Sequence, residues 1–241
     1  MFGAIPKKAW SRKYPSDEQN CCCLAMNCLL VWNSERIILL DTGAGNKALG
    51  KLSYYGFRER KDLRDLVRLH GFSPEQITDV VLSHLHFDHC GGCTYCDEAG
   101  ELQIAFPNAR HWVGEQQWQN YLHPNALEKD AFRREDMMPV FNAGLIHRID
   151  SDFELCDGFN LKLFDGHTKD QIVSFIKTDV QSWALFPGDV IPTKAHLSSE
   201  WISAYDIEPL QSLAAKTALK EWAKHKNVTT IFYHDIYHLS L

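Results

Sequence analysis

Residues 77–89 read Ile-Thr-Asp-Val-Val-Leu-Ser-His-Leu-His-Phe-Asp-His, and this stretch decides both the expected fold and the expected chemistry. Its first part, Ile77–Leu82, is short, apolar and rich in β-branched residues, which is typical of a buried strand. Its second part holds four ligand-type side chains, His84, His86, Asp88 and His89. One ion cannot easily take four neighbouring loop residues with tetrahedral angles. The stretch therefore predicts a strand that leads into a site for more than one metal ion.

The segments upstream of this stretch predict strands and a helix. Two apolar runs, Cys22–Trp32 and Arg36–Leu40, flank a short polar turn and are typical of a β-hairpin. The second run ends in the sequence Asp-Thr-Gly-Ala-Gly at residues 41–45, where glycines permit a sharp turn. Arg58–His70 carries apolar residues at helical spacing and is followed by a glycine, which predicts a helix.

The segments downstream continue this mixture of helices and strands. Helices are predicted at about Gly114–Leu122, Glu128–Phe141 and Glu208–His225. Strands are predicted at Leu145–Ile149, Phe159–Phe164, Ile172–Lys177, Trp183–Phe186 and Val228–Tyr233. Because helices and strands intermingle along the chain, we expect layered α/β packing in one domain, residues 1–241.

The composition excludes several classes of function. The chain has 241 residues, a net charge of −6 and a sequence pI near 6.0, so it lacks the basic surface that grips nucleic acid without regard to sequence. No apolar run reaches the roughly 20 residues that a membrane helix needs, and residues 1–10 do not read as a secretory signal. The eight cysteines are therefore expected to be reduced, in a cytoplasmic protein.

The cluster at residues 84–89 resembles the signature of the metallo-β-lactamase superfamily of binuclear metal hydrolases. Further motifs of that family follow in the same order along the chain. They are Asp41-Thr42-Gly43, Gly166-His167-Thr168, Gly188-Asp189 and His234. Phe87 gives the variant His-Leu-His-Phe-Asp-His, which looks like the lactonase and organophosphate-hydrolase branches. The resemblance implies an α/β fold of the metallo-β-lactamase type, an αββα four-layer sandwich.

The same resemblance implies a complete set of metal ligands. Metal 1 would be held by His84, His86 and His167, and metal 2 by Asp88, His89 and His234. Asp189 would bridge the two ions. Two divalent ions, zinc by default with manganese or iron as alternatives, would share a bridging hydroxide that attacks a small ester, lactone or phosphoester. Asp88 and Asp189 are the carboxylates expected to orient that hydroxide. Asp41 is interpreted either as a hydrogen-bonding partner of the ligand loop or as a plain turn residue.

Three residues near these motifs bear on catalysis and substrate choice. His196 follows Asp189 by a short segment, and we interpret it as a substrate contact or proton shuttle, with a surface loop histidine as the alternative. Phe87 is interpreted as an apolar wall for the substrate or as a core aromatic residue. Pro192 stands where lactonases of this type often carry a tyrosine, so an oxyanion donor is missing. We therefore expect hydrolysis of aryl esters or phosphotriesters to be at least comparable to that of acyl-homoserine lactones.

Alternatives stay open at this point. The mononuclear iron-dependent sulfur dioxygenases of the same fold share these ligands. A nuclease of the superfamily is disfavoured by the acidic charge. Cys90, Cys93 and Cys96 could instead form a metal-binding or redox module, although a fourth cysteine is lacking nearby. The expected partner is a small-molecule substrate, with neither nucleic acid nor a membrane, and a homodimer is possible.

Overall fold

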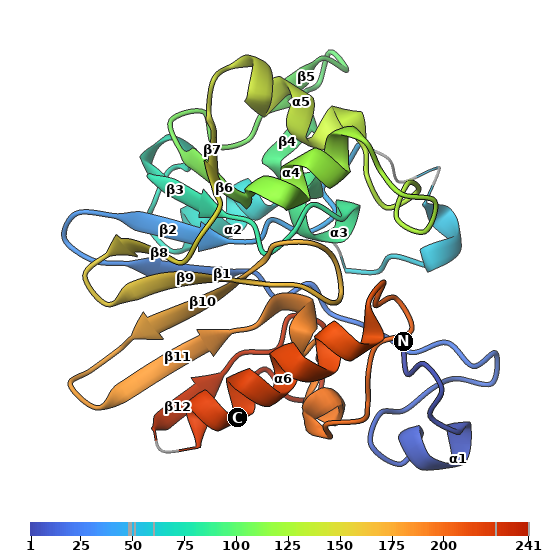
Figure 1. The fold of residues 1–241 in the computed structure, drawn as a ribbon. Helices are drawn as coiled ribbons and strands as arrows, with labels where there is room; N and C mark the ends of the chain where they lie inside the picture. Colours follow the sequence, from blue (N-terminus) through green and yellow to red (C-terminus); the bar gives the residue numbers. More distant parts are fainter. Residues whose placement is uncertain (48–49, 51, 60, 225, 241) are drawn as a thin grey trace. The chain divides into compact units, whose positions relative to one another are not determined.

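The computed structural model describes the whole chain except residues 48–49, 51, 60, 225 and 241 (Figure 1). Backbone contacts divide the chain into two compact units. Cys28–Ile149 form the central unit, and Met1–Asn27 together with Asp150–Leu241 form the terminal unit. Each unit has its own five-stranded sheet and its own buried apolar cluster. The expectation of one domain over residues 1–241 stays a prediction.

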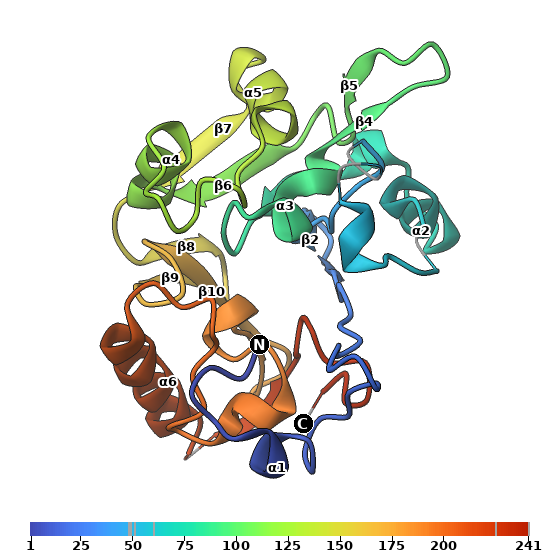
Figure 2. The same cartoon turned by 90° about the vertical axis from the view of Figure 1, so that its right-hand side faces the viewer.

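The central unit contains a mostly parallel sheet with the strand order β1-β2-β3-β6-β7. The strands are β1 (Leu29–Trp32), β2 (Ile37–Leu40), β3 (Asp79–Val81), β6 (Arg110–Gly114) and β7 (Ile146–Ile149). The hairpin β1–β2 is antiparallel, whereas β2, β3, β6 and β7 run parallel. Parallel neighbours need long crossover connections. Helices α2 (Leu63–Leu69), α4 (Glu115–Leu122) and α5 (Arg134–Asn142) lie in those crossovers (Figure 2).

Short elements complete the central unit. They are the helix α3 (Phe87–Cys90), the 3-10 turns η1 (Ser53–Tyr55), η2 (Pro74–Gln76) and η3 (Gly91–Cys93), and the hairpin β4 (Thr94–Cys96) and β5 (Leu102–Ile104). Helix α2 begins where the Asp62 side chain accepts a hydrogen bond from the Arg64 backbone N–H at 2.9 Å. It ends before Gly71, whose φ of 86° suits a glycine.

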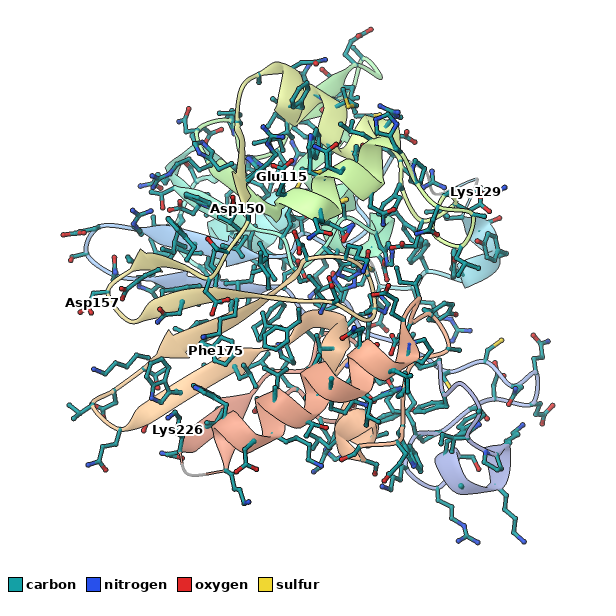
Figure 3. The ribbon with its side chains drawn as sticks, viewed as in Figure 1. Glu115, Lys129, Asp150, Asp157, Phe175 and Lys226 are labelled. Carbon is teal, nitrogen blue, oxygen red and sulfur yellow. The ribbon has the colours of Figure 1, made fainter. Side chains whose placement is uncertain are left out.

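The terminal unit contains a mostly antiparallel sheet with the order β12-β11-β10-β9-β8. The strands are β8 (Phe153–Cys156), β9 (Phe159–Phe164), β10 (Gln171–Lys177), β11 (Ser182–Phe186) and β12 (Asn227–Thr230), of which β11 and β12 are parallel. Helix α6 (Pro209–Ala223) packs on this sheet, and the ring of Phe175 on β10 (Figure 3) meets the ring of Trp222 edge-on at 4.6 Å between centroids. Helix α1 (Lys7–Trp10) and the 3-10 turns η4 (Gly188–Val190) and η5 (Lys194–Leu197) also belong to this unit.

Most of the predicted elements are present. The hairpin β1–β2, strands β3, β7, β9, β10 and β11, and helices α2, α4 and α6 are confirmed, with boundaries that differ by a few residues. Arg60 and His225, which fall in predicted helices, lie outside the described residues. The predicted strand Val228–Tyr233 ends at Thr230, and the run from Cys22 becomes a strand only at Leu29.

Two predictions on local structure are wrong. The helix predicted from Glu128 begins only at Arg134, because Glu128–Ala131 form turns and the Ala131 carbonyl accepts a hydrogen bond from Phe87 N–H. The strand predicted from Cys22 is absent over residues 22–28, which lie outside the sheet and leave Cys23 exposed. Strands β6 and β8 were not predicted, because polar residues break their apolar pattern.

No helix in the described part of the chain is both long enough and apolar enough to cross a membrane.

Candidate metal centre

The predicted cluster lies in the central unit, directly after strand β3. Residues 83–86 leave the strand in an irregular path, and Asp88 and His89 then fall in the short helix α3. His84, His86 and His89 are 1%, 8% and 0% exposed. Neutral imidazoles are buried at a lower cost than charged groups, but their ring nitrogens still require partners.

Asp41, at the end of the neighbouring strand β2, supplies the partner of His89 and holds Ser83 beside it. Its side chain is fully buried and accepts hydrogen bonds from Ser83 N–H at 2.6 Å, Ser83 Oγ–H at 2.7 Å and His89 Nδ1–H at 2.8 Å. Its backbone φ is 55°, a conformation that aspartate tolerates better than most residues. Asp41 is therefore more than a turn residue: it fixes the segment that carries the cluster.

The turn that holds Asp41 meets the loop after the cluster at very close range. A Cβ atom added at Gly92 would lie 2.1 Å from the Thr42 carbonyl oxygen. The Thr42 N–H and the Thr42 hydroxyl both donate to the His89 carbonyl, at 2.7 and 3.0 Å. Only glycine fits at residue 92, which explains why the cluster is followed by Cys-Gly-Gly.

These contacts decide which ring nitrogen of each histidine carries the proton. The Asp41 carboxylate only accepts, so His89 donates from Nδ1, and Ser83 Oγ, which gives its own proton to Asp41, accepts from His84 Nδ1 at 3.1 Å. His86 instead points Nε2 at Glu128 Oε1, 3.1 Å away, and donates there. The lone pairs of the neutral rings therefore lie on His84 Nε2, His86 Nδ1 and His89 Nε2.

Two of these lone pairs face one another. His84 Nε2 and His86 Nδ1 are 3.0 Å apart. Two unprotonated nitrogens at that distance repel each other unless a cation lies between them. Nitrogen ligands of a tetrahedral zinc ion, each about 2.0–2.1 Å from the metal, are about 3.3 Å apart. The donor set therefore fits a metal ion.

Glu128 belongs to this arrangement although sequence patterns gave it no role. Its carboxylate is 3% exposed and accepts from Asn120 Nδ2 at 2.8 Å and from Asn125 Nδ2. A carboxylate held in this way orients the His86 ring and raises its basicity.

The terminal unit holds the other predicted ligands. His167 donates from Nδ1 to Asp206 Oδ1 at 2.9 Å, and His234 donates from Nδ1 to the Ala25 carbonyl at 2.8 Å. Both rings then present Nε2 to Asp189. His167 Nε2 is 3.4 Å from Asp189 Oδ2, and His234 Nε2 is 3.3 Å from Asp189 Oδ1.

This arrangement gives each oxygen of Asp189 its own histidine. A carboxylate facing two lone pairs is also unfavourable without cations. One oxygen of Asp189 therefore lies beside each of two candidate ligand histidines. Asp206, which orients His167, was not predicted, since it lies in an irregular segment 39 residues further along the chain.

His196 is fully buried within the terminal unit. Its Nδ1 is 2.7 Å from Thr193 Oγ1, and its ring stacks on Phe2 at 4.8 Å between centroids. Burial, with the Lys216 ammonium as a smaller cause, lowers the pKa of His196 to about 3, so the ring is neutral. The alternative of a surface loop histidine is therefore wrong. Its role in catalysis stays a prediction.

The cysteines after the cluster show no sign of a separate metal site. Cys90 and Cys93 are fully buried in the apolar cluster of the central unit, and burial raises the pKa of both thiols, that of Cys93 to about 12. Cys90 Sγ donates to the Leu85 carbonyl at 3.3 Å. Among the described residues, the histidine and aspartate groups that could hold a metal ion are drawn from the seven predicted ligands and include no cysteine.

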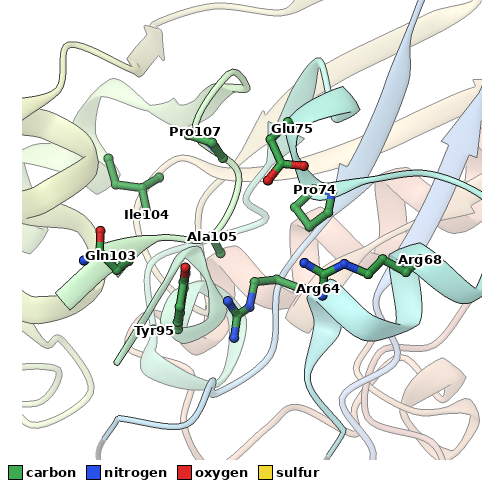
Figure 4. Close-up of a pocket in the computed structure, with 9 residues that line it drawn as sticks. All are labelled: Arg64, Arg68, Pro74, Glu75, Tyr95, Gln103, Ile104, Ala105 and Pro107. Carbon is green, nitrogen blue, oxygen red and sulfur yellow. The ribbon is translucent and has the colours of Figure 1, made fainter. Parts of the chain in front are cut away.

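A cavity of about 370 Å³ opens elsewhere on the central unit (Figure 4). Its lining includes Arg64, Arg68, Glu75 and Tyr95 and none of the predicted site residues. Both arginines are already paired, Arg64 with Asp62 and Arg68 with Asp65. This cavity is therefore distinct from the candidate centre, and both of its arginines are compensated.

Comparisons with known proteins agree with this geometry. The family model of the metallo-beta-lactamase superfamily matches residues 23–220. The N-acyl homoserine lactonase AiiA of Bacillus thuringiensis subsp. kurstaki is 25% identical over 220 residues, which cover 87% of this chain and 80% of that protein.

Two solved structures resemble the chain as a whole. A probable metal-dependent hydrolase from Staphylococcus aureus is 28% identical and has a TM-score of 0.92. The match covers 100% of this chain and 85% of that one. AidC, a dizinc quorum-quenching lactonase, shares the fold at 24% identity, with a TM-score of 0.70 over 90% of this chain and 74% of that chain.

The expected α/β fold class and the expected enzyme class are thereby confirmed. The protein is an enzyme, a hydrolase related to lactonases, with candidate metal-binding histidines and aspartates. Because the family model covers most of the chain and the motifs occur in its order, the chain belongs to the metallo-beta-lactamase superfamily.

Proposed function

We propose that this protein is a binuclear metal-dependent hydrolase that acts on a small ester, lactone or phosphoester. His84, His86 and His167 hold one divalent ion, and Asp88, His89 and His234 hold the other. Asp189 serves both. Zinc is the preferred metal, because neutral imidazoles and carboxylates are its common ligands and because AidC is a dizinc enzyme.

The observation that carries this proposal is the acceptor that faces one ring nitrogen of each candidate histidine. Each of the five candidate histidines donates from one ring nitrogen to an acceptor in its own unit. Those acceptors are Ser83, Glu128, Asp41, Asp206 and the Ala25 carbonyl. The other nitrogen of each ring then carries no proton and can coordinate a cation. Five fixed lone pairs beside two carboxylates form a ligand set for cations, whereas a polar loop or a structural hydrogen-bond network would alternate donors with acceptors.

When bound, two divalent ions supply a water activated at neutral pH and stabilise negative charge on the reacting oxygens. The protein residues provide the rest of the mechanism. Asp41, Glu128 and Asp206 keep the rings in the correct tautomer and orientation. Asp88 or Asp189 orients the attacking water and accepts its proton. His196, held neutral by burial, is proposed to contact the substrate or to pass a proton to the leaving group.

Aromatic residues beside the cluster support a partly apolar substrate. Phe87, inside the cluster, lies 5.4 Å from the ring of Tyr55, which in turn lies 4.2 Å from Tyr54. Tyr54 is 76% exposed, so this series of rings runs from the buried ligand segment to the surface of the central unit. The Arg133 guanidinium lies 5.8 Å from the Phe87 ring. An uncharged or weakly anionic substrate with an apolar group suits this surface.

The relatives that act on N-acyl homoserine lactones make a lactone one candidate substrate. Pro192 weakens that candidate, because it is buried and offers no hydroxyl; its carbonyl accepts from His234 N–H at 2.9 Å. One missing oxyanion donor typically lowers kcat by a factor of about 10²–10³. We therefore propose that aryl esters or phosphotriesters are hydrolysed at least comparably to acyl-homoserine lactones.

The test begins with elemental analysis of protein purified without chelator, which should find about two metal ions per chain. The ratio kcat/KM is then measured for an aryl ester, a phosphotriester and an acyl-homoserine lactone on one zinc-loaded preparation. Asp189→Ala, purified in parallel, controls for contaminating hydrolases. Protein that stays metal-free after reconstitution with zinc, manganese or iron refutes the site. A lactone preference of several orders of magnitude refutes the ranking, and iron-dependent oxygen consumption with persulfides refutes hydrolysis.

A further inference from the structure

Lys216 is a buried lysine in the middle of helix α6. Its side chain is only 2% exposed, and it ranks among the largest fully buried side chains of the described residues. An ammonium group is strongly hydrated, so its burial is unfavourable unless nearby groups compensate it. A lysine in this place therefore needs a reason beyond filling space.

The partners of Lys216 belong to one segment. Its Nζ donates to the Trp201 carbonyl at 2.6 Å. Burial lowers the pKa of Lys216 to about 8, while the carboxylates of Asp206 and Glu200 raise it. The amine therefore stays mostly protonated at neutral pH. Its hydrogen bond and its attractive charges all come from residues 200–206.

That segment has little structure of its own. Residues 198–208 contain neither helix nor strand, and few backbone hydrogen bonds are made within them. The segment nevertheless carries Asp206, whose Oδ1 must lie 2.9 Å from His167 Nδ1 to fix that ring. The segment is also held from outside: Ala204 N–H donates to the Met1 carbonyl at 3.0 Å and Ile207 N–H to the His167 carbonyl at 3.4 Å. Lys216 Nζ adds the contact to the Trp201 carbonyl, near the start of the segment.

Helix α6 already holds the other side of His167. A Cβ atom added at Gly166 would lie 2.5 Å from the Ser212 backbone nitrogen, so Gly166 sits directly on the first turns of α6. The Gly166 carbonyl accepts from Glu208 N–H at 2.9 Å. Helix α6 thus contacts Gly166, which precedes His167 in the chain. Through Lys216 it also contacts the segment that carries Asp206.

We propose that Lys216 is a positioning residue of the candidate metal centre, which fixes residues 201–206 so that Asp206 stays on His167 Nδ1. This inference rests on the proposed function, in which His167 is a metal ligand. Lys216 acts through the Trp201 carbonyl and Asp206.

The experiment compares zinc affinity by competition with a chromophoric chelator. Lys216→Met removes the N–H groups and the charge while keeping an unbranched side chain of similar length. Lys220→Met is the matched control, because Lys220 lies one turn further along the same helix and its Nζ contacts Ser199 Oγ of the same segment, exposed, at 3.0 Å. We expect Lys216→Met to lower zinc affinity about tenfold and Lys220→Met to leave it unchanged, since partners that orient a ligand contribute about 10–100-fold.

A double-mutant cycle with Asp206→Asn separates positioning from general stability. If Lys216 acts through Asp206, the double variant binds zinc no more weakly than Asp206→Asn alone. Losses that add, or a folded Lys216→Met with wild-type zinc affinity, overturn the proposal. Lys216→Gln, which keeps a donor, enters the same cycle if the methionine variant does not fold. If neither variant folds, Lys216 supports the whole unit rather than the segment, and the proposal is refuted.

A readout without metal distinguishes this inference from the proposed function. In zinc-free protein, Lys216→Met should speed amide hydrogen exchange at Ser203–Ile207 relative to Lys220→Met. If wild-type protein binds no zinc but Lys216→Met still exchanges faster than Lys220→Met, the metal centre is refuted and the role of Lys216 in fixing residues 201–206 stands. If wild-type protein binds zinc but the two variants exchange at the same rate, only the role of Lys216 in fixing this segment is refuted.

Discussion

Asp41→Asn tests whether the proton pattern of the histidines prepares the metal centre. Asparagine keeps the size of the side chain and tolerates the φ of 55° at this residue. The amide oxygen can still accept from Ser83 N–H. Its NH₂ group, however, would face the Nδ1–H of His89, which is 2.8 Å from Asp41 Oδ2 in the wild type.

The magnitude follows from that contact. The amide N–H of the new asparagine and the Nδ1–H of His89 would then be two donors pointing at each other. His89 avoids this by moving its proton to Nε2, which is the nitrogen proposed to bind metal. A hydrogen bond to a charged group contributes about 1.5–3 kcal/mol, and partners that orient metal ligands contribute about 10–100-fold in affinity. We therefore expect zinc affinity to fall about 10–100-fold, which corresponds to about 1.4–2.7 kcal/mol.

The assay is chelator competition on folded protein, together with urea unfolding of the metal-free form. Asp79→Asn is the matched control. Asp79 is also fully buried in the central unit, but it accepts from Arg36, Arg110 and Trp112 and contacts none of the candidate histidines. This control should lose stability while its zinc affinity stays at the wild-type value. A folded Asp41→Asn with wild-type zinc affinity would refute the tautomer argument.

Four further predictions address single residues. Asp189→Ala should lose both metal ions and hydrolysis together, since one carboxylate serves both ions; elemental analysis showing two ions retained contradicts this. His196→Ala should keep its metal content but change kcat or substrate preference, and wild-type kinetics on every substrate would show that His196 is not at the substrate. Gly166→Ala should destabilise the protein by several kcal/mol, seen as a lower urea midpoint, because φ is +137° and the new Cβ would lie 2.5 Å from the Ser212 backbone nitrogen. Burial raises the pKa of Asp136 to about 6, although the Lys47 ammonium lowers it, so the folded state binds this proton more tightly than the unfolded state. The contribution of Asp136 to the free energy of unfolding should therefore fall as the pH rises from about 4 to 6. Asp136→Asn should lose this pH dependence in urea titrations.

The sequence predicts the parts of this protein that are encoded locally. The strand Ile77–Leu82 and the ligands after it are adjacent in the chain, so an apolar run rich in β-branched residues and the residue types that follow it suffice to find them. Asp41 was found through the Asp-Thr-Gly motif of the family resemblance. The structure explains its contacts, because β2 pairs in parallel with β3 and the ends of such strands meet at one edge of the sheet.

The parts that could not be predicted depend on distant contacts. Glu128 reaches His86 across 42 residues and Asp206 reaches His167 across 39, each from a segment that is neither helix nor strand. The helical spacing around Glu128 favoured a helix there, because spacing along the chain contains no information on the contact between its carboxylate and the distant His86. The burial of His196 could not be predicted for a similar reason, since its ring stacks on Phe2, which is far away in the chain.

The terminal unit is built from two segments separated by the whole central unit, and this has a consequence for the order of folding. Residues 28–149 are contiguous and can form their sheet as soon as they leave the ribosome. Residues 25 and 27 must wait for residues 233 and 234, with which they share backbone hydrogen bonds of 3.1 and 2.9 Å. Closing the loop between these two segments costs about 5 kcal/mol of conformational entropy. Contacts between residues so far apart in the sequence form slowly. The histidines at 84–89 can therefore be in place early, whereas the Ala25 carbonyl can orient His234 only after residue 234 has been synthesised.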